Sequence, residues 1–457
     1  MKKLLLFMIS ILMLLPMAAG CGKEGGELKV KDGDNIVFAK KGYKSPFSIL
    51  YDIGSNDADL ISSIAKEITR VYGDTLPEED SYLDPKESPY EIIINAIERK
   101  ECEDIYNTLA DGEYAIKTVI TDTKTSIVIA YKGDTARMIA VGGFIYKYVL
   151  GDTKQASVPA DLNIREMAQS PIVESGVPAL RDPCVLLDNG TYYMYGTGWV
   201  CYKNSSGKLD GTWEGPVSVV SLPEGHEADT NYWAPEVHKY GGYYYMFTTY
   251  HSSVTNHRGC TILRADNPLG PFEEITNGQI TPKDWDCIDG TLYVDEAGQP
   301  WIVFVHEWIS MPDKIGSFCA AKLSDDLTKF VSEPIELFKA RDTSWANAGV
   351  TDGCWMYRTA EGELLMVWSN FDKYGYSVAI ARSESGNILG TWKHDERQLY
   401  SWCYTGEYDG GHGMIFTDTD GQMYLSMHSP NTKTNNRGEM PVFLKIREEN
   451  NTIVWDY

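Results

Sequence analysis

Five stretches of this sequence repeat one layout: an apolar run, a polar turn that contains glycine, and a second apolar or aromatic run. Each stretch is typical of a β-hairpin with a turn of the Asn-Gly, Gly-Gly or Asp-Gly kind. The stretches begin 52 to 63 residues apart, a spacing that fits four-stranded blades around an axis, whereas a β-sandwich would not predict such even spacing. The sequence therefore predicts a mainly β fold, with a five-bladed β-propeller over residues 165–457. The five hairpins are 184–198, 236–250, 291–308, 354–371 and 414–430.

The residues two positions before each hairpin form a candidate site. In a propeller the innermost strand of each blade runs along the axis, so equivalent positions meet at one end of the central channel. Carboxylates brought together raise the pKa of at least one of them, as a general acid requires, while another stays ionised as a base. Any single Asp could instead cap a turn, but three in matching register favour a functional site. The aligned positions hold Asp182, Ala234, Asp289, Asp352 and His412.

Two carboxyl groups acting on a polyol-like substrate suggest cleavage of a glycosidic bond. Aromatic residues near these positions support this interpretation, because a flat ring can lie against a sugar ring. Any one tryptophan is more often part of a core, so we expect only two or three of them to line the site. The candidates are Trp233, Trp308, Trp345 and Trp355.

The charge of the chain excludes one broad class of partner. Among its 457 residues are 41 Lys+Arg and 65 Asp+Glu, a net charge of −24, so nucleic acid would be repelled at long range. Beyond the first twenty residues no stretch is long and apolar enough to span a bilayer. The cysteines after Cys21 show neither Cys-x-x-Cys pairs nor zinc-ligand spacing, so we expect buried thiols. These features exclude a nucleic-acid-binding protein and a polytopic membrane protein.

Residues 1–21 resemble a lipoprotein signal peptide. A basic start and a short apolar run lead into Ala-Ala-Gly-Cys, which ends at Cys21. A signal peptidase would cut before Cys21 and leave it lipidated; the alternative is an ordinary secretory signal cut near Ala19. Residues 22–44, Gly-rich and polar at their start, are interpreted as a tether. The sequence thus predicts an exported bacterial protein, held at a membrane through Cys21 or secreted.

Four motifs in the propeller region, in the same order, resemble those of glycoside hydrolase family 43, whose members are five-bladed propellers. They are an Asp-Pro before a Gly-x-Tyr-Tyr strand, a Trp-Ala-Pro-[Asp/Glu]-Val signature, a third-blade Ile-Asp pattern, and a Gly-Gly-His-Gly segment before the last blade. The resemblance runs from about residue 175 to the C-terminus. The matching segments are 181–183 with 190–193, 233–237, 288–298 and 410–413, with a blade-edge phrase at 264–272.

The resemblance implies roles for three carboxylates. Asp182 would be the general base that activates water, and Asp352 the general acid that protonates the leaving oxygen. Asp289 would keep the pKa of the acid high and orient it. The reaction would invert the anomeric configuration, with the base and acid carboxyls about 6.5–9.5 Å apart.

One position departs from the family pattern. The family places its general acid in Thr-Glu-Gly-Pro, whereas this chain has Thr-Asp-Gly-Cys at 351–354. The Asp352 carboxyl is therefore one methylene closer to the backbone than the usual Glu. Glu236 and Glu307 are alternative acids should Asp352 be structural, although Glu236 is expected to be a scaffold or substrate-contact residue.

The remaining site predictions also rest on the resemblance. His412 matches a position that faces a central cation, often calcium, or its waters, although calcium itself prefers oxygen ligands; the alternative is a core histidine. No cofactor is required for the chemistry. Arg258 is expected to contact substrate, with a surface salt bridge as the alternative. The predicted substrate-binding residues are Trp233, Glu236, Arg258, Trp308 and Trp355.

The resemblance implies hydrolysis of α-L-arabinofuranosyl or β-D-xylosyl linkages in plant polysaccharides such as arabinan or arabinoxylan. The alternative from another class is a non-catalytic surface glycan-binding lipoprotein that uses the same cleft, although a pure binder would not need three carboxylates at the channel mouth.

A small α/β domain is predicted before the propeller, over residues 45–152. Its layout resembles that of the α/β domain that precedes the catalytic domain in β-hexosaminidases and some other glycoside hydrolases. Because it contains no carboxylate pair or ligand set, we interpret it as a spacer or docking domain. Its expected elements are strands at 47–54 and 90–96, a hairpin at 114–133, and helices at 57–73 and about 135–149.

Overall fold

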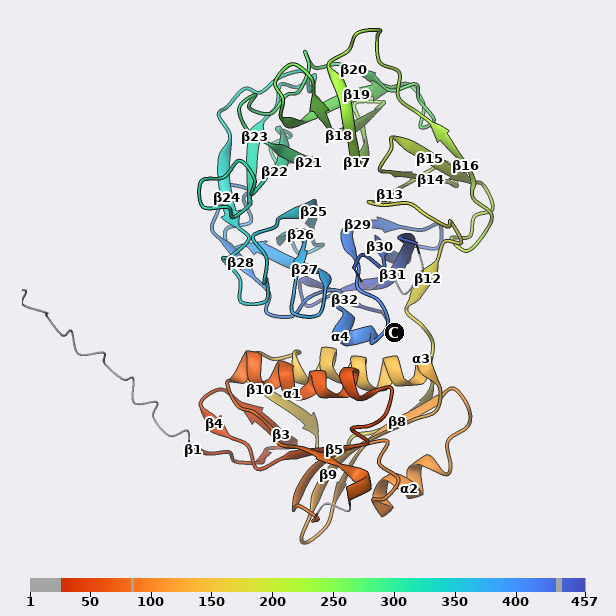
Figure 1. Cartoon of the computed structure of the whole chain (residues 1–457), viewed down its shortest axis with the longest axis vertical. Coiled ribbons are helices and arrows are strands. Elements are labelled where there is room, and N and C mark those ends of the chain that lie inside the picture. The colour runs from red at the N-terminus through yellow and green to blue at the C-terminus, as the bar shows by residue number, and fades with distance from the viewer. Residues whose placement is uncertain (1–25, 84–85, 433–437, 457) are drawn as a thin grey trace, which may run out of the picture.

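The computed structural model describes residues 26–83, 86–432 and 438–456, which form a ring of five sheets and a smaller α/β domain (Figure 1). The first strand of each predicted hairpin is the innermost strand of a blade, and the chain then builds each blade outward. The prediction of a mainly β propeller fold is confirmed. The two inner strands of each blade are β13 (Cys184–Asp188) with β14 (Thr191–Gly196), β17 (Ala228–Tyr240) with β18 (Tyr243–Ser252), β21 (Cys287–Val294) with β22 (Pro300–His306), β25 (Asp352–Arg358) with β26 (Leu364–Phe371), and β29 (Gly411–Thr417) with β30 (Met423–Ser429).

The outer strands complete the blades and close the ring. β12 pairs antiparallel with β31 in the fifth blade, although β12 precedes the first blade in the chain. This pairing ties the start of the propeller to its end. The outer strands are β15 (Val200–Asn204) and β16 (Glu214–Ser218), β19 (Arg258–Ala265) and β20 (Glu273–Glu274), β23 (Ser317–Lys322) and β24 (Ile335–Lys339), β27 (Tyr376–Ser383) and β28 (Trp392–His394), and in the fifth blade β31 (Met440–Glu449), β12 (Ile172–Glu174) and β32 (Thr452–Trp455).

A six-stranded mixed sheet, in the order β11-β8-β9-β7-β5-β6, forms the centre of the α/β domain. The helix α1 packs on the domain core through an apolar stripe at helical spacing, which includes the buried Leu60, Ile64 and Ile68. The elements are β5 (Ser48–Tyr51), α1 (Ala58–Tyr72), β6 (Glu78–Asp80), β7 (Tyr90–Ile94), α2 (Lys100–Tyr106), β8 (Glu113–Ile120), β9 (Thr125–Tyr131), α3 (Asp134–Arg137) continued by wider helical turns at Met138–Gly142 and Ile145–Val149, and β11 (Asn163–Met167).

The α/β domain extends beyond the predicted boundaries at both ends. The segment interpreted as a tether, 22–44, includes β3 (Asn35–Lys40), which pairs with β10 (Gln155–Pro159). β11 also belongs to this domain, whereas the sequence predicts that the propeller begins at residue 165. These strands are short and their partners lie far away in the chain, so their local patterns resemble a linker. Three two-residue strands complete the segment: β1 (Gly26–Glu27), β2 (Lys31–Asp32) and β4 (Tyr43–Lys44).

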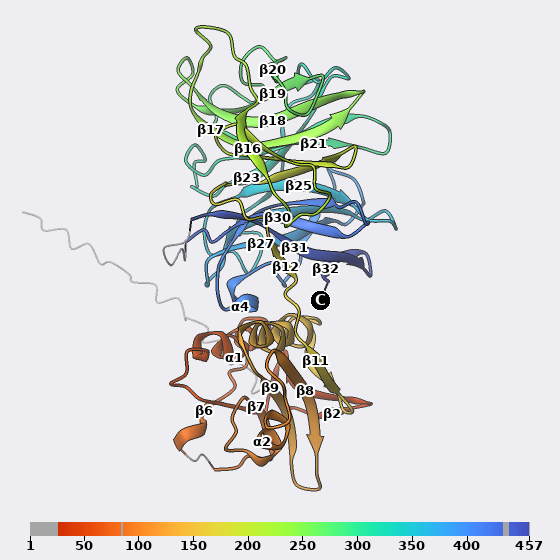
Figure 2. The ribbon, with the colours of Figure 1, turned by 90° about the vertical axis from the view of Figure 1, so that its right-hand side faces the viewer.

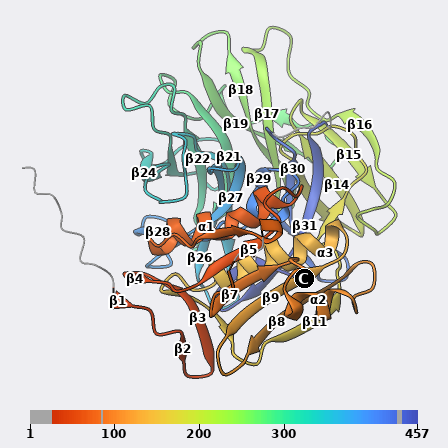
Figure 3. The ribbon, with the colours of Figure 1, turned by 60° about the horizontal axis from the view of Figure 1, so that its bottom comes forward.

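The two domains share one hydrophobic core. The long helices of the α/β domain lie between its sheet and the propeller, and they face the fourth and fifth blades (Figures 1, 2 and 3). Tyr146 stacks on Trp455 with ring centroids 5.4 Å apart and packs edge-on against Tyr404 in α4 (Trp402–Thr405). Gly142 permits the close approach, because a Cβ at that position would lie 1.7 Å from the Tyr404 carbonyl oxygen. An apolar interface of this kind favours a fixed relation between the domains.

Two further predictions concern the cysteines and the membrane. The eight cysteines from Cys102 to Cys403 are buried free thiols, as expected. Within the described ranges, no helix is long and apolar enough to cross a bilayer. The signal peptide over residues 1–21 and the lipidation site at Cys21 lie outside the described residues.

Candidate active site

One residue in each blade has a left-handed backbone conformation at the end of the channel where the innermost strands begin. In blades two to five it lies at a β-bulge, where the strand register shifts. This conformation is strained for a residue with a side chain, and bulges re-aim side chains next to functional sites. Four of these residues are aligned positions of the sequence analysis; in the fourth blade the residue is Gly353, not Asp352. The φ angles are 54° at Asp182, 43° at Ala234, 55° at Asp289, 47° at Gly353 and 57° at His412.

Each of these five residues donates its backbone N–H to a side-chain atom of a neighbouring blade. For four of the five residues, the acceptor is a side chain near the end of the second strand of the preceding blade, and the fifth blade precedes the first in the ring. The two strands of a hairpin are antiparallel, so the second strand ends at the same end of the channel at which the first strand begins. In the fourth blade the acceptor is Asp289 Oδ2, 2.9 Å from the Gly353 nitrogen. The other pairs are Asp182 with His428 Nδ1 (3.3 Å), Ala234 with Thr197 Oγ1 (3.1 Å), Asp289 with Thr249 Oγ1 (3.0 Å) and His412 with Ser369 Oγ (2.8 Å).

Asp182 is surrounded by groups that favour its ionised form. The Thr197 hydroxyl donates to Oδ2 at 2.5 Å, and the Nδ1 atoms of His412 and His428 each lie 3.4 Å from Oδ1. Burial alone would raise the pKa of Asp182, but the two histidines and Arg181 hold it well below its usual range. Asp182 is therefore a buried carboxylate that stays ionised, as a general base requires.

Asp352 has the opposite electrostatic environment. Burial of its carboxyl and the nearby Asp289 raise the pKa of Asp352 to about 7, although His412 and a hydrogen bond from Tyr376 act in the other direction. The Tyr376 hydroxyl donates to Asp352 Oδ2 at 3.0 Å. Asp352 thus holds a proton that it can release near neutral pH, as a general acid requires.

Asp289 contacts His412 and the backbone beside Asp352. Its Oδ2 accepts the Gly353 N–H and lies 3.9 Å from His412 Nδ1. Burial, followed by the charges of Asp182 and Glu236, raises the pKa of Asp289 well above its usual range. The negative charge of the ionised Asp182 thus disfavours ionisation of both Asp289 and Asp352.

The structure brings together four predicted residues, Asp182, Asp289, Asp352 and His412, and adds others that sequence reasoning missed. His428 and Thr197 lie near the ends of second strands, which pair with the beginnings of first strands, so the predicted hairpin register could have found them. Tyr376 begins the third strand of its blade, and the hairpin pattern contains no signal for it.

Glu236 and Trp355 lie deeper along the innermost strands than the aspartates. Glu236 is buried, and His238 Nε2 lies 3.4 Å from one of its oxygens. Burial raises the pKa of Glu236 to about 8. Trp355 stacks on His238 with ring centroids 5.2 Å apart and packs against two hydrophobic clusters. These contacts favour a packing role for Trp355.

A second polar cluster lies on the second and third blades. Arg258 Nε donates to Glu307 Oε2 at 2.8 Å, and the guanidinium lies over the Trp233 ring at 5.4 Å. Burial raises the pKa of Glu307, while Arg258 acts to lower it. Trp308 is half-buried in the turn that follows β22, whereas Trp345 is a buried core residue that packs against Trp368. Of the two alternative acids, Glu307 is therefore paired with a cation.

His412 is the residue predicted to face a central cation or its waters. His412 Nε2 is buried without a hydrogen-bond partner in the described part of the chain. However, no group of three or more His, Cys, Asp or Glu side chains in those residues could hold a metal, and calcium takes six or more oxygens. The side chains do not fit a directly coordinated calcium ion.

Comparisons with known proteins agree with this architecture. The sequence matches Glycosyl hydrolases family 43 over residues 169–450, more than half of the chain. The crystal structure of endo-arabinase from Bacteroides thetaiotaomicron VPI-5482 superposes with a TM-score of 0.55 at 35% identity, and the match covers 61% of this chain and 98% of that one.

Two enzyme sequences are also similar. The probable arabinan endo-1,5-alpha-L-arabinosidase A of Aspergillus flavus is 25% identical over 56% of this chain and 75% of its own length. The extracellular exo-alpha-(1->5)-L-arabinofuranosidase ArbA of Cellvibrio japonicus is 26% identical over 34% of this chain, and the match spans about half of that enzyme (47%). On the strength of the family match, together with the five blades and the carboxylates at the end of their channel, the chain belongs to glycosyl hydrolase family 43.

Proposed function

We propose that this protein is an inverting glycosidase in which Asp182 is the general base and Asp352 the general acid. The observation that carries the proposal is the opposite direction of their pKa shifts: that of Asp182 is lowered, and that of Asp352 is raised to about 7. Two carboxyl groups whose environments separate their pKa values in this way match the acid and base of a glycosidase.

The proposed reaction needs only these two proton transfers. Asp182 takes a proton from water as the water oxygen bonds to the anomeric carbon, on the face opposite the leaving group. Asp352 gives its proton to the glycosidic oxygen as the bond from that oxygen to the anomeric carbon breaks. Asp289 would keep Asp352 protonated and hold the backbone beside it through the Gly353 N–H. No step passes through a metal ion.

We propose α-1,5-linked arabinan as the substrate, because the similar enzymes are named for endo or exo action on arabinan or α-(1→5)-arabinofuranosyl linkages. Arg258 and Trp233 are proposed to contact the sugar beside the reacting unit, since together they offer a cation and a ring face. Trp308 is proposed as a further contact, and Glu236 as a scaffold residue inside the channel.

We propose that the protein is exported and attached to a membrane through a lipid on Cys21, which is supported by the sequence pattern of residues 1–21 and by the extracellular relative. Expression of the full chain in a bacterium with a radiolabelled fatty acid tests this. Label that disappears in Cys21→Ser, while protein is still exported, supports lipidation; an unlabelled, secreted wild type contradicts it.

The activity is tested with linear arabinan, arabinoxylan, and aryl glycosides of α-L-arabinofuranose and β-D-xylose. NMR identifies the first-formed anomer for the wild type, Asp182→Asn and Asp352→Asn. We expect release of the inverted anomer from arabinan, lost in Asp182→Asn. Hydrolysis of β-D-xylosides alone would replace the substrate assignment. Binding to glycans without hydrolysis of any of them would favour the glycan-capture alternative and contradict the enzyme proposal.

A further inference from the structure

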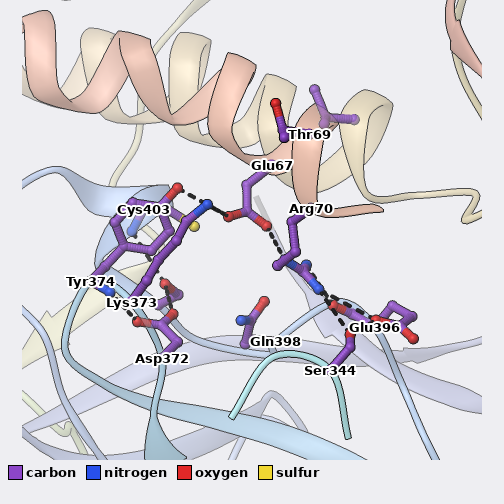
Figure 4. A network of polar contacts seen from close by, with 12 residues as sticks. Glu67, Thr69, Arg70, Ser344, Asp372, Lys373, Tyr374, Glu396, Gln398 and Cys403 are labelled. Carbon is purple, nitrogen blue, oxygen red and sulfur yellow. Dashed lines mark hydrogen bonds and ion pairs between the residues drawn. The ribbon is translucent and has the colours of Figure 1, made fainter. Parts of the chain in front are cut away.

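The α/β domain contacts the propeller at a turn that leads directly into the candidate active site. The turn is 372–375, between β26 and β27, and Tyr376 follows it at once. Glu67, buried in α1, accepts the Tyr374 hydroxyl at 3.0 Å and pairs with Lys373 Nζ at 3.0 Å (Figure 4). Its other oxygen accepts Arg70 Nε at 2.7 Å. Both carboxylate oxygens of Glu67 are therefore engaged, and one of them is engaged entirely by the turn.

Hydrogen bonds within the propeller make this turn rigid. The Asp372 carboxyl accepts the N–H of Tyr374 at 2.7 Å and that of Gly375 at 3.0 Å, and its second oxygen accepts the Ser401 hydroxyl at 2.6 Å. The Tyr374 ring stacks on Trp402. Because these bonds close the turn, we expect a displacement of Tyr374 to be passed on to the next two residues of the chain.

Tyr376 connects the turn to the carboxyl of the proposed acid. Its N–H donates to the buried Asp409 at 3.0 Å, its ring stacks on His428, and its hydroxyl donates to Asp352 at 3.0 Å. The ring lies so close to Gly411 that a Cβ there would be 2.4 Å away. In the described ranges Tyr376 is the sole hydrogen-bond donor to the Asp352 side chain, so it determines where that short side chain points.

We propose that the α/β domain positions the general acid of the propeller: Glu67 fixes the turn 372–375, the turn fixes Tyr376, and Tyr376 orients the Asp352 carboxyl toward the leaving group. This inference rests on the proposed function, in which Asp352 is the acid. Glu67 and Tyr374 are positioning residues that act through Tyr376 and do not touch the substrate. The domain is then part of the catalytic unit and not a spacer.

The test compares Glu67→Gln and the milder Tyr374→Phe with Glu396→Gln in the full chain. Glu396 is the matched control, because it also binds Arg70 across the interface (3.3 Å) but, among the described residues, makes no hydrogen bond or ion pair with the turn. The assay measures kcat and KM on phenyl and 2,4-dinitrophenyl glycosides of the sugar that wild type hydrolyses. The phenolate leaves poorly and needs the proton of the acid, whereas the dinitrophenolate does not.

We expect Glu67→Gln and Tyr374→Phe to lower kcat about 5- to 20-fold on the phenyl glycoside and less than about 2-fold on the dinitrophenyl glycoside. KM should not change, and Glu396→Gln should behave as wild type. In a Tyr376→Phe background, Glu67→Gln should have no further effect on the ratio of the two rates. Equal losses on both substrates, or an additive effect in Tyr376→Phe, would show that Glu67 only stabilises the interface and would overturn the proposal.

Hydrogen–deuterium exchange provides a readout that does not need turnover. The peptide that covers 371–378 should exchange faster in Glu67→Gln than in wild type or Glu396→Gln. Unchanged exchange in this peptide contradicts the positioning role whatever the activity. If the wild type hydrolyses no glycoside but the peptide still exchanges faster in Glu67→Gln, the two proposals separate: the contact would be real, and the proposed function would be wrong.

Discussion

Buried carboxyl groups occur in two regions of this molecule with opposite consequences. At the domain interface, burial would raise the pKa of Glu67, but Arg70 and Lys373 outweigh it and lower that pKa. At the end of the propeller channel, burial is the main cause that raises the pKa of both Asp289 and Asp352, and the charge of Asp182 adds to it in both. Burial alone therefore does not decide the state of a carboxyl. At the interface the cationic partners of Glu67 make a structural ion pair, whereas at the channel end carboxyl groups whose pKa values are shifted in opposite directions can divide the roles of base and acid.

The largest expected effect comes from the one channel-end aspartate whose pKa is lowered. Asp182→Asn should reduce kcat on arabinan by about 10³-fold, because an amide cannot accept the proton of water. The matched control is Asp188→Asn, at the far end of the same hairpin, where the carboxylate pairs with Lys239. Steady-state kinetics check both. Activity within about 10-fold of wild type in Asp182→Asn would assign the base to another residue.

The dependence of the rate on the leaving group should distinguish the acid from the base. Asp352→Asn should lose about 10²- to 10³-fold of kcat on phenyl glycosides but less than about 10-fold on dinitrophenyl glycosides. Rates for both substrates, measured side by side, check this. If Asp352→Asn leaves the rate on phenyl glycosides unchanged, the general acid would be Glu236 or Glu307 instead.

The pH profile should reflect both shifts. Because Asp352 must be protonated, kcat/KM should fall as pH rises through about 7, its raised pKa. The lowered pKa of Asp182 keeps the base ionised in acid, so activity should persist below pH about 4, near the ordinary pKa of aspartic acid. Initial rates across the pH range in which the protein stays folded check both limbs. A loss of activity centred near pH 5 on the acidic side would contradict the environment assigned to Asp182.

At the domain interface, Glu67→Gln should change the stability of the protein more than the rate of the reaction. Glu67→Gln should lower the free energy of unfolding by about 1–3 kcal/mol at neutral pH, since Arg70 and Lys373 lose their anion. A lowered folded-state pKa contributes stability that is present above the unfolded value, about 4.3, and is lost as pH falls through the folded value. The difference between wild type and Glu67→Gln should therefore shrink in acid. Denaturant unfolding at pH 7 and below pH 4 measures it, and a difference independent of pH would contradict the ion-pair assignment.

The smallest effect is expected in the polar cluster of Arg258, Trp233 and Glu307 on the second and third blades. Arg258→Lys keeps the charge but loses the planar group over Trp233 and the Nε–H donated to Glu307. KM should rise about 3- to 10-fold with kcat changed less than about 2-fold, because the contact serves binding alone. A fall in kcat at constant KM would give Arg258 a role in the chemistry. Kinetics on arabino-oligosaccharides check this.

The sequence predicted the propeller and much of its site because both depend on repetition. The regular recurrence of the hairpins placed Asp182, Asp289 and His412 at equivalent positions, and the structure finds all three in the same left-handed conformation. The boundaries of the α/β domain were wrong because β3 and β10 are short and pair only across the whole domain. A local pattern contains no information on such a distant partner.

The amino-acid sequence by itself determined the number of blades, the order of the strands and the types of residue at the mouth of the channel. Tertiary structure decided the rest: which carboxyl has a raised pKa, that Tyr376 donates to Asp352, and that Glu67 reaches the turn 372–375 from another domain. The physical reason is that hairpin periodicity is a local property, whereas a pKa and a side-chain direction depend on charges and hydrogen bonds brought together from distant parts of the chain.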